Sequence, residues 1–142
     1  MKFISSAPGR IDFLNTHQDY KGLPTVPIAI DRRVRMVAEP RDDRLLSALS
    51  NNVAGGRRRE SFPLDRPAYE KKAWWGNYLR AVVNSLAVYG RDLRGLDVVI
   101  EGNLPIASGL GSSAALEVAF AELINRANDL GANTRDIAEA CY

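Results

Sequence analysis

The hydrophobic and polar residues of this chain alternate first with the period of strands and later with the period of helices. Residues 33–39 alternate charged and apolar side chains except at Val37. This pattern is typical of a strand with one face in water. Further strands are predicted at residues 2–7 and 10–15, on either side of a turn at Pro8-Gly9, and at residues 26–30, 45–49 and 96–101.

The second half of the chain carries the three- and four-residue spacing of amphipathic helices. One helix is predicted over residues 74–89, and Gly90 is expected to end it. Residues 112–130 have a wide apolar face and are followed by Gly131. A last helix is predicted to begin at Thr134 as its N-cap, and no C-cap follows it. We therefore expect an N-terminal portion of a longer protein, truncated at its end.

The order of these elements predicts the fold class. Strands come first and helices later, which indicates an α+β fold. We expect a two-layer sandwich, in which a mainly antiparallel, mixed sheet has its helices on one side. Residues 16–24 and 51–72 are polar and contain turn-forming residues, so both are predicted to be exposed loops. No repeat or linker divides the chain, and we treat residues 1–142 as one domain.

The net charge, the cysteine content and the lengths of the apolar segments limit which kinds of partner and compartment are expected. Net charge is +2, from 19 basic and 17 acidic residues, so no long-range field draws the chain to nucleic acid or to a membrane. The single cysteine, Cys141, excludes a disulfide framework and fits a reducing cytoplasm. No segment has the length of a transmembrane helix or the form of a signal peptide. We expect a cytoplasmic protein with no nucleic-acid or membrane partner.

A strand, a glycine-rich turn and a helix follow one another between residues 98 and 120. The first turn of a helix has unpaired backbone N–H groups, and its dipole adds positive charge there. Glycine lets backbone approach a phosphate closely. Ser112 and Ser113 add hydroxyls that can cap the helix, bind phosphate oxygen or ligate Mg²⁺. The segment is an anion site by its chemistry; an ordinary glycine turn with a serine N-cap is the alternative.

The longer string Pro-Ile-Ala-Ser-Gly-Leu-Gly-Ser-Ser-Ala at residues 105–114 resembles the phosphate-binding motif of the GHMP kinases. This family is named for galactokinase, homoserine kinase, mevalonate kinase and phosphomevalonate kinase. The resemblance implies the family's N-terminal domain, with its ribosomal-protein-like fold, and ATP and Mg²⁺ as cofactors. It implies nucleotide binding by Pro105, Gly109, Leu110, Gly111, Ser112, Ser113 and Ala114, with Ser113 also ligating the metal.

Two other segments resemble galactokinases. Residues 7–20 match the galactokinase signature at Gly9, Arg10, His17, Asp19 and Tyr20 and depart from it at Asp12, Asn15 and Thr16. This resemblance implies a catalytic Arg10 and substrate binding by Thr16, His17 and Asp19, whose groups suit sugar hydroxyls. A polar turn and a surface ion pair are the alternatives. Trp75-Gly76-Asn77-Tyr78 resembles the segment near the nucleotide base, which implies base contacts by Trp75 and Tyr78; core packing is the alternative.

Together these resemblances imply an ATP-dependent small-molecule kinase that transfers the γ-phosphoryl group to a sugar hydroxyl. Thr16 stands where galactokinases have Glu, and Gly111 makes the glycine-rich string more similar to that of mevalonate kinase. The identity of the sugar is therefore left open. A mevalonate-type kinase and a non-catalytic sensor for sugar and ATP are the alternatives; the charge balance disfavours an RNA-binding domain of the same fold. The family's activating Asp lies after the glycine turn, beyond residue 142. We therefore expect this chain alone to be inactive without the missing C-terminal portion.

Overall fold

The computed structural model describes residues 1–14, 21–90 and 92–141. These residues form five strands and three α-helices, with one short 3₁₀ helix (η2) between β3 and β4. The elements are β1 (Phe3–Leu14), β2 (Val26–Pro40), β3 (Leu45–Ser50), η2 (Gly55–Arg57), β4 (Arg59–Pro63), α1 (Gly76–Leu86), β5 (Leu96–Gly102), α2 (Ser112–Asn128) and α3 (Thr134–Ala140). No helix among the described residues is long and apolar enough to cross a membrane.

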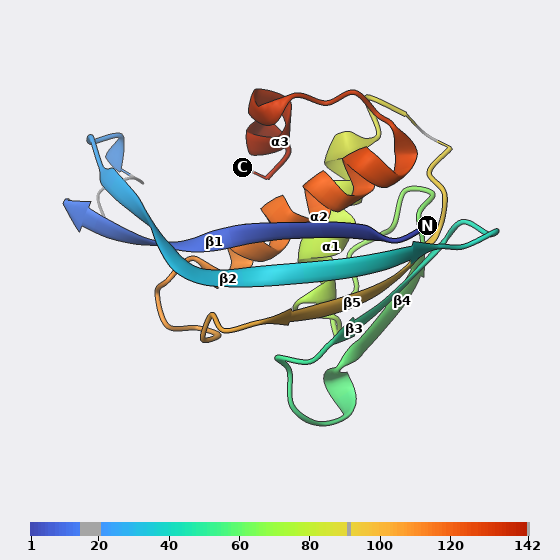
Figure 1. The fold of residues 1–142 in the computed structure, drawn as a ribbon, viewed down its shortest axis with the longest axis horizontal. Coiled ribbons are helices and arrows are strands. Elements are labelled where there is room, and N and C mark those ends of the chain that lie inside the picture. The colour runs from blue at the N-terminus through green and yellow to red at the C-terminus, as the bar shows by residue number, and fades with distance from the viewer. Residues whose placement is uncertain (15–20, 91, 142) are drawn as a thin grey trace.

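The five strands form one mixed sheet in the order β1-β2-β5-β3-β4. All neighbouring strands run antiparallel except β3 and β5, which are parallel. The helices lie on one side of this sheet (Figure 1), with α2 packed on β1 and β2, α1 beside α2, and α3 against α2. The predicted α+β sandwich with helices on one side is confirmed.

One hydrophobic core lies between the sheet and the helices. In β2 the alternation predicted from the sequence holds, because Met36 and Ala38 are fully buried while Arg35 and Glu39 face solvent. The helices close the core with the following buried side chains: Leu79, Val82, Val83, Leu86, Ala119, Phe120, Leu123 and Ile124. Burial of this apolar surface is the main force that holds the two layers together.

The predicted turn at Pro8-Gly9 is wrong, because β1 runs through it as one strand. The pairing with β2 shifts register between Pro8 and Arg10, which marks an irregularity of the bulge type. A Cβ atom at Gly9 would lie 2.5 Å from Leu104 Cδ1 and 2.8 Å from the Leu110 carbonyl oxygen. Glycine at this position therefore allows residues 104 and 110 to pack closely against β1, and it does not reverse the chain.

The polar segment over residues 51–72 is not only a loop, because it contains β4 (Arg59–Pro63). In β4 the side chain of Phe62 is buried and that of Glu60 points to the same, inner face. A charged residue at an inward position hides the apolar alternation of a short strand. This is why the sequence pattern did not predict β4.

The predicted helix ends also need correction. The first helix ends at Leu86, before Gly90, and α2 ends at Asn128 with Asp129 as its left-handed C-cap. The N-cap of α3 is Asn133 and not Thr134. The Asn133 side chain accepts from the backbone N–H of Asp136, whose carboxylate accepts from the Asn133 N–H. This reciprocal capping box satisfies the first N–H groups of α3.

A buried ion pair joins β4 to α1. Arg80 Nη1 lies 3.1 Å from Glu60 Oε2, and the two side chains are only 8% and 14% exposed. The Arg80 guanidinium also lies over the Phe62 ring, 4.2 Å from its centroid. The charge of each partner is compensated mainly by the other, because water has little access to them.

We expect Arg80→Met to destabilise the chain by about 3 kcal/mol, because Glu60 is left as an uncompensated buried charge. The double variant Arg80→Met/Glu60→Gln should recover most of that loss, since no buried charge remains. Urea denaturation followed by circular dichroism measures both. Arg135→Met, which removes an exposed ion pair of α3, is the control and should change little. Equal losses in the single and double variants would contradict the assignment.

Candidate functional site

The glycine-rich turn between β5 and α2 presents an open helix N-terminus. Gly109 and Gly111 have φ values of 75° and 69°, and Gly111 is the N-cap of α2. No side chain caps this helix and its first turn contains no acidic residue. The first bond inside the helix is donated by Ala115 N to Gly111 O at 3.0 Å. The preceding N–H groups have no partner within the helix and point to where an anion would lie.

Strand β1 contacts this turn through Arg10. Arg10 N donates to the Leu110 carbonyl at 2.9 Å, and this bond joins residues a hundred positions apart. The Arg10 side chain crosses the turn so closely that a Cβ at Gly111 would lie 3.0 Å from Arg10 Cγ. The Arg10 guanidinium pairs with Asp12 and stays partly exposed. The surface ion pair, which was the alternative to a catalytic role for Arg10, therefore exists, and it lies beside the turn.

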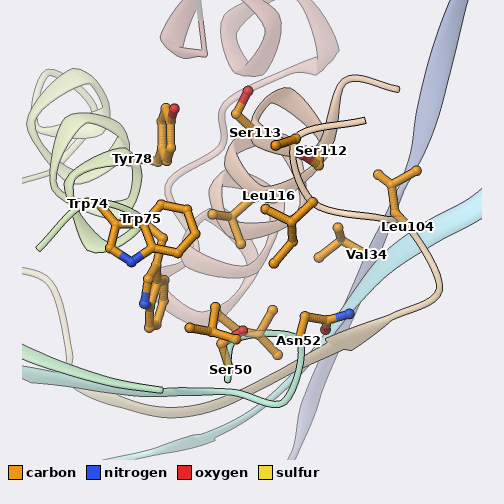
Figure 2. Close-up of a pocket in the computed structure, with 14 residues that line it drawn as sticks. Val34, Ser50, Asn52, Trp74, Trp75, Tyr78, Leu104, Ser112, Ser113 and Leu116 are labelled. Atoms are coloured by element: carbon orange, nitrogen blue, oxygen red, sulfur yellow. The ribbon is translucent and has the colours of Figure 1, made fainter. Parts of the chain in front are cut away.

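A pocket of about 230 Å³ opens next to the turn. Its walls come from β2, the end of β3, the segment before α1, the β5–α2 connection and the first turns of α2. Figure 2 shows the rings of Trp74, Trp75 and Tyr78 on one side and Ser112 and Ser113 on another. Apolar side chains dominate the lining and hydroxyl groups stand at its edge toward the turn. A flat apolar group bearing an anionic tail fits this arrangement.

The three aromatic residues contribute differently. Trp75 is 3% exposed and its indole N–H donates to the Arg57 carbonyl at 2.9 Å, so it is part of the core as well as of the wall. Trp74 and Tyr78 are 44% and 39% exposed and offer accessible ring surface. Trp74 was not predicted as a site residue. Its position just before α1 begins, off the buried helix face, is the signal that could have identified it.

The opposite wall holds a polar residue that the sequence did not indicate. Asn52 follows β3, and its Nδ2 donates to the Gly102 carbonyl at 2.8 Å. This bond ties the end of β3 to the end of β5. Asn52 and Ser50 both line the pocket, so its floor is not purely apolar. No sequence motif marked either residue.

The structure brings together most of the predicted nucleotide-binding residues. Trp75, Tyr78, Ser112 and Ser113 line the pocket directly. The remaining ones form the adjacent turn and the start of α2: Pro105, Gly109, Leu110, Gly111 and Ala114. The turn is closed by a bond from Ser108 Oγ to the Pro105 carbonyl at 2.9 Å. The predicted substrate-binding residues Thr16, His17 and Asp19 lie outside the described residues.

The glycine turn has no cluster of metal-ligating side chains beside it in the described part of the chain. Within residues 1–14, 21–90 and 92–141, no group of three or more His, Cys, Asp or Glu side chains could hold a metal ion. Glu117 lies one helical turn after Ser113, and partial burial raises the pKa of its carboxyl. Burial and the proximity of Glu117 raise the pKa of the Cys141 thiol to about 11. The predicted metal ligand Ser113 therefore has no preformed carboxylate cluster around it in the described part of the chain.

Comparison with known proteins gives two family matches. The family model described as the GHMP kinases N terminal domain matches residues 77–142, which include most of α1, the glycine turn and α2. The galactokinase galactose-binding signature matches residues 1–40, which include β1 and β2. The two matches therefore meet in space where Arg10 contacts Leu110.

Relatives and solved structures agree with these matches. The chain is 39% identical over 131 residues to a galactokinase of Chloroflexus aggregans, covering 90% of this chain and 33% of that protein. It is 35% identical over 139 residues to a galactokinase of Chloroflexus aurantiacus, covering 96% and 35%. The chain thus spans about a third of the length of these relatives.

Among solved structures, Lactococcus lactis galactokinase complexed with galactose superposes with a TM-score of 0.88 at 26% identity, over 99% of this chain and 36% of that one. Methanococcus jannaschii mevalonate kinase superposes with a TM-score of 0.81 at 17% identity, over 100% and 45%, which shows a shared fold. The predicted resemblance to the GHMP kinases, and to galactokinases among them, is therefore confirmed, because separate family models match the segment with the glycine turn and the N-terminal strands, and curated galactokinases align over most of this chain.

Proposed function

We propose that the full encoded polypeptide is an ATP-dependent sugar kinase of the galactokinase type. The observation that carries this proposal is the junction of three parts. An uncapped α2 N-terminus, an aromatic pocket and the Arg10 strand all meet at residues 104–113. A nucleotide has a matching succession of groups, because a flat base is joined through ribose to a polyanionic chain.

The pocket and turn suggest how the nucleotide lies. The base would contact the exposed rings of Trp74 and Tyr78, since aromatic side chains stack on any base. Ser112 and Ser113 line the pocket and also begin α2, so the phosphate chain would run from the pocket onto the helix N-terminus. The backbone N–H groups of the turn would bind phosphate oxygens without a rearrangement of the chain.

The serine hydroxyls at the start of α2 fit a Mg²⁺ that is held mainly by substrate phosphates and water. Magnesium is commonly held by one or two protein oxygens together with substrate phosphates and water. The Ser113 hydroxyl is the candidate protein oxygen, and a bound metal would neutralise phosphate charge there. Within this chain, the groups that bind and orient the phosphates are the α2 N–H donors and the two serine hydroxyls.

Arg10 has a role in the same proposal. Phosphoryl transfer depends mainly on positioning and on stabilising the charge that develops on the transferred group. The Arg10 guanidinium pairs with Asp12, which orients it beside the glycine turn. Its permanent positive charge would stabilise a phosphoryl group that leaves the turn toward an acceptor.

The N-terminal segment supports the choice of acceptor. Thr16, His17 and Asp19 lie in the stretch that the galactokinase galactose-binding signature matches. Both relatives described above are named galactokinases, and the Lactococcus lactis structure contains galactose. We therefore propose a hexose of the galactose type as the acceptor, ahead of mevalonate, which is supported by Gly111 in the glycine turn and by a likeness of fold.

The direct test is ADP release by the full encoded polypeptide with ATP and Mg²⁺. A coupled assay compares galactose, glucose, mannose, fucose and mevalonate. We expect turnover with galactose or a close epimer, and loss of at least 100-fold in the Arg10→Met variant, since a charge in contact with the transferred group is removed. Turnover with mevalonate alone would assign the alternative kinase class. Tight calorimetric binding of sugar and ATP without any turnover would instead identify a sensor.

Gly111→Ala should weaken ADP binding about tenfold or more, because a side chain is strained at φ of 69° and meets Arg10, which displaces the turn. Isothermal titration calorimetry measures the affinity. Gly131→Ala is the matched control, since Gly131 has φ of 72° at the other end of α2 with open space around it. The control should share the strain and keep the affinity. Equal affinities for both variants would contradict the role of the turn.

Trp74→Ala should also weaken ADP binding by about tenfold, as expected when one base–aromatic contact is lost. Tyr69→Ala is the comparison, because Tyr69 is more exposed than Trp74 and does not line the pocket. Quenching of the remaining tryptophan fluorescence by ADP, or calorimetry, gives the affinities. If Trp74→Ala and Tyr69→Ala bind ADP equally well, the base does not lie in this pocket.

A further inference from the structure

The connection between β3 and β4, together with the first residue of β4, carries an excess of positive charge. Arg57, Arg58 and Arg59 follow one another there, and none of them takes part in an ion pair in the described part of the chain. The adjacent Glu60 does not neutralise them, because it points to the inner face and pairs with Arg80. Elsewhere in the fold arginines do find carboxylates, as Arg41 does with Asp43 at 2.6 Å.

Two of these arginines, Arg58 and Arg59, line a depression. It has a volume of about 310 Å³ and is lined by Leu49, Gly55, Gly56, Arg58 and Arg59. Figure 1 shows the β3–β4 connection with its short 3₁₀ helix projecting from the sheet on the side away from α3. Leu49 supplies an apolar wall and the two glycines leave main chain uncovered by side chains. The depression is therefore separate from the pocket at the glycine turn.

The donors in this depression suit a phosphate group. Arginine has five N–H donors in a planar fork that matches phosphate oxygens. Arg58 uses two of its nitrogens within the chain, donating from Nη2 to Asn51 Oδ1 at 2.7 Å and from Nε to the Ser50 carbonyl at 3.4 Å. These bonds fix its guanidinium in place, and its remaining N–H groups stay available for a ligand.

We propose that this depression binds a phosphorylated small metabolite, such as a sugar phosphate, as a site distinct from the glycine turn. Arg58 and Arg59 would bind the phosphate group, and Leu49 would contact the carbon skeleton. A small anion fits better than nucleic acid, because the cations are confined to one hairpin and the chain as a whole is nearly balanced in charge.

The same hairpin is bonded to the nucleotide pocket. The Trp75 indole N–H donates to the Arg57 carbonyl at 2.9 Å, and Ser50 N donates to the Arg58 carbonyl at 2.8 Å. Trp75 and Ser50 both line the pocket of about 230 Å³. A ligand that restrains the hairpin would therefore also restrain two walls of the pocket and raise the affinity for the nucleotide. The nucleotide would in turn raise the affinity for that ligand by the same factor. This coupling rests on the proposed function, whereas the anion site does not.

The test of the site uses inorganic pyrophosphate as probe and ADP to fill the glycine turn. With ADP saturating, we expect pyrophosphate to shift the side-chain Nε–Hε NMR signals of Arg58 and Arg59 and the Trp75 indole signal. In Arg59→Ala the affinity for pyrophosphate should fall about tenfold or more, because a charged hydrogen-bond donor is lost. Arg58 is kept because it supports Ser50 and Asn51. Arg35→Ala, at an exposed position of β2, is the control and should bind as the wild type does.

Contrary outcomes separate the site from its coupling. Equal pyrophosphate affinity in the wild type and the Arg59→Ala variant, or shifts confined to residues 108–114, would overturn the site. A short RNA that binds the hairpin arginines more tightly than pyrophosphate or galactose 1-phosphate does would overturn the small-molecule assignment. If the arginine signals shift but ADP affinity is the same with and without pyrophosphate, the coupling is wrong and the site stands. If ADP fails to bind at all, the proposed function fails, and the titration without ADP still decides the site.

Discussion

The hydrogen bond from Arg10 N to Leu110 O is the contact on which the arrangement of the site depends. It exists because β1 shifts register next to Gly9, which frees a main-chain donor from the regular ladder with β2. Leu104 and Leu110 then fill the space that a side chain at residue 9 would occupy. One glycine in an N-terminal strand thereby fixes a turn that the chain forms a hundred residues later.

The pairing of β3 with β5 determines where the pocket opens. Because these two strands are parallel, their carboxyl ends leave the sheet at the same edge. Asn52 follows one strand and the glycine turn follows the other, and the bond from Asn52 Nδ2 to the Gly102 carbonyl joins the two ends. Helix α1 contributes its N-terminal end to the same region, which brings the aromatic side chains to it. The site is thus a product of strand direction as much as of any single motif.

The sequence predicted the features that depend on local order. Alternation over residues 33–39 predicted a strand, and the glycine-serine string after a strand predicted the turn before a helix. Features that depend on distant residues were missed. Pro8-Gly9 resembles a turn until Leu104 and Leu110 are placed against it, and Glu60 conceals β4 until Arg80 is placed beside it. The pocket wall at Ser50 and Asn52 could not be predicted, because its residues come from segments with no shared periodicity.

The position of β5 in the sheet also has a consequence for the order in which the chain acquires structure. During synthesis two hairpins, β1–β2 and β3–β4, leave the ribosome first, and each can pair locally. Neither has a partner for its inner edge until Leu96–Gly102 emerges, because β5 is the strand between them. The sheet closes only with this late, central strand, and contacts so distant in sequence make folding slow. Until then the edges of β2 and β3 that β5 later occupies are open to pairing with other chains, and such unpaired edges favour aggregation.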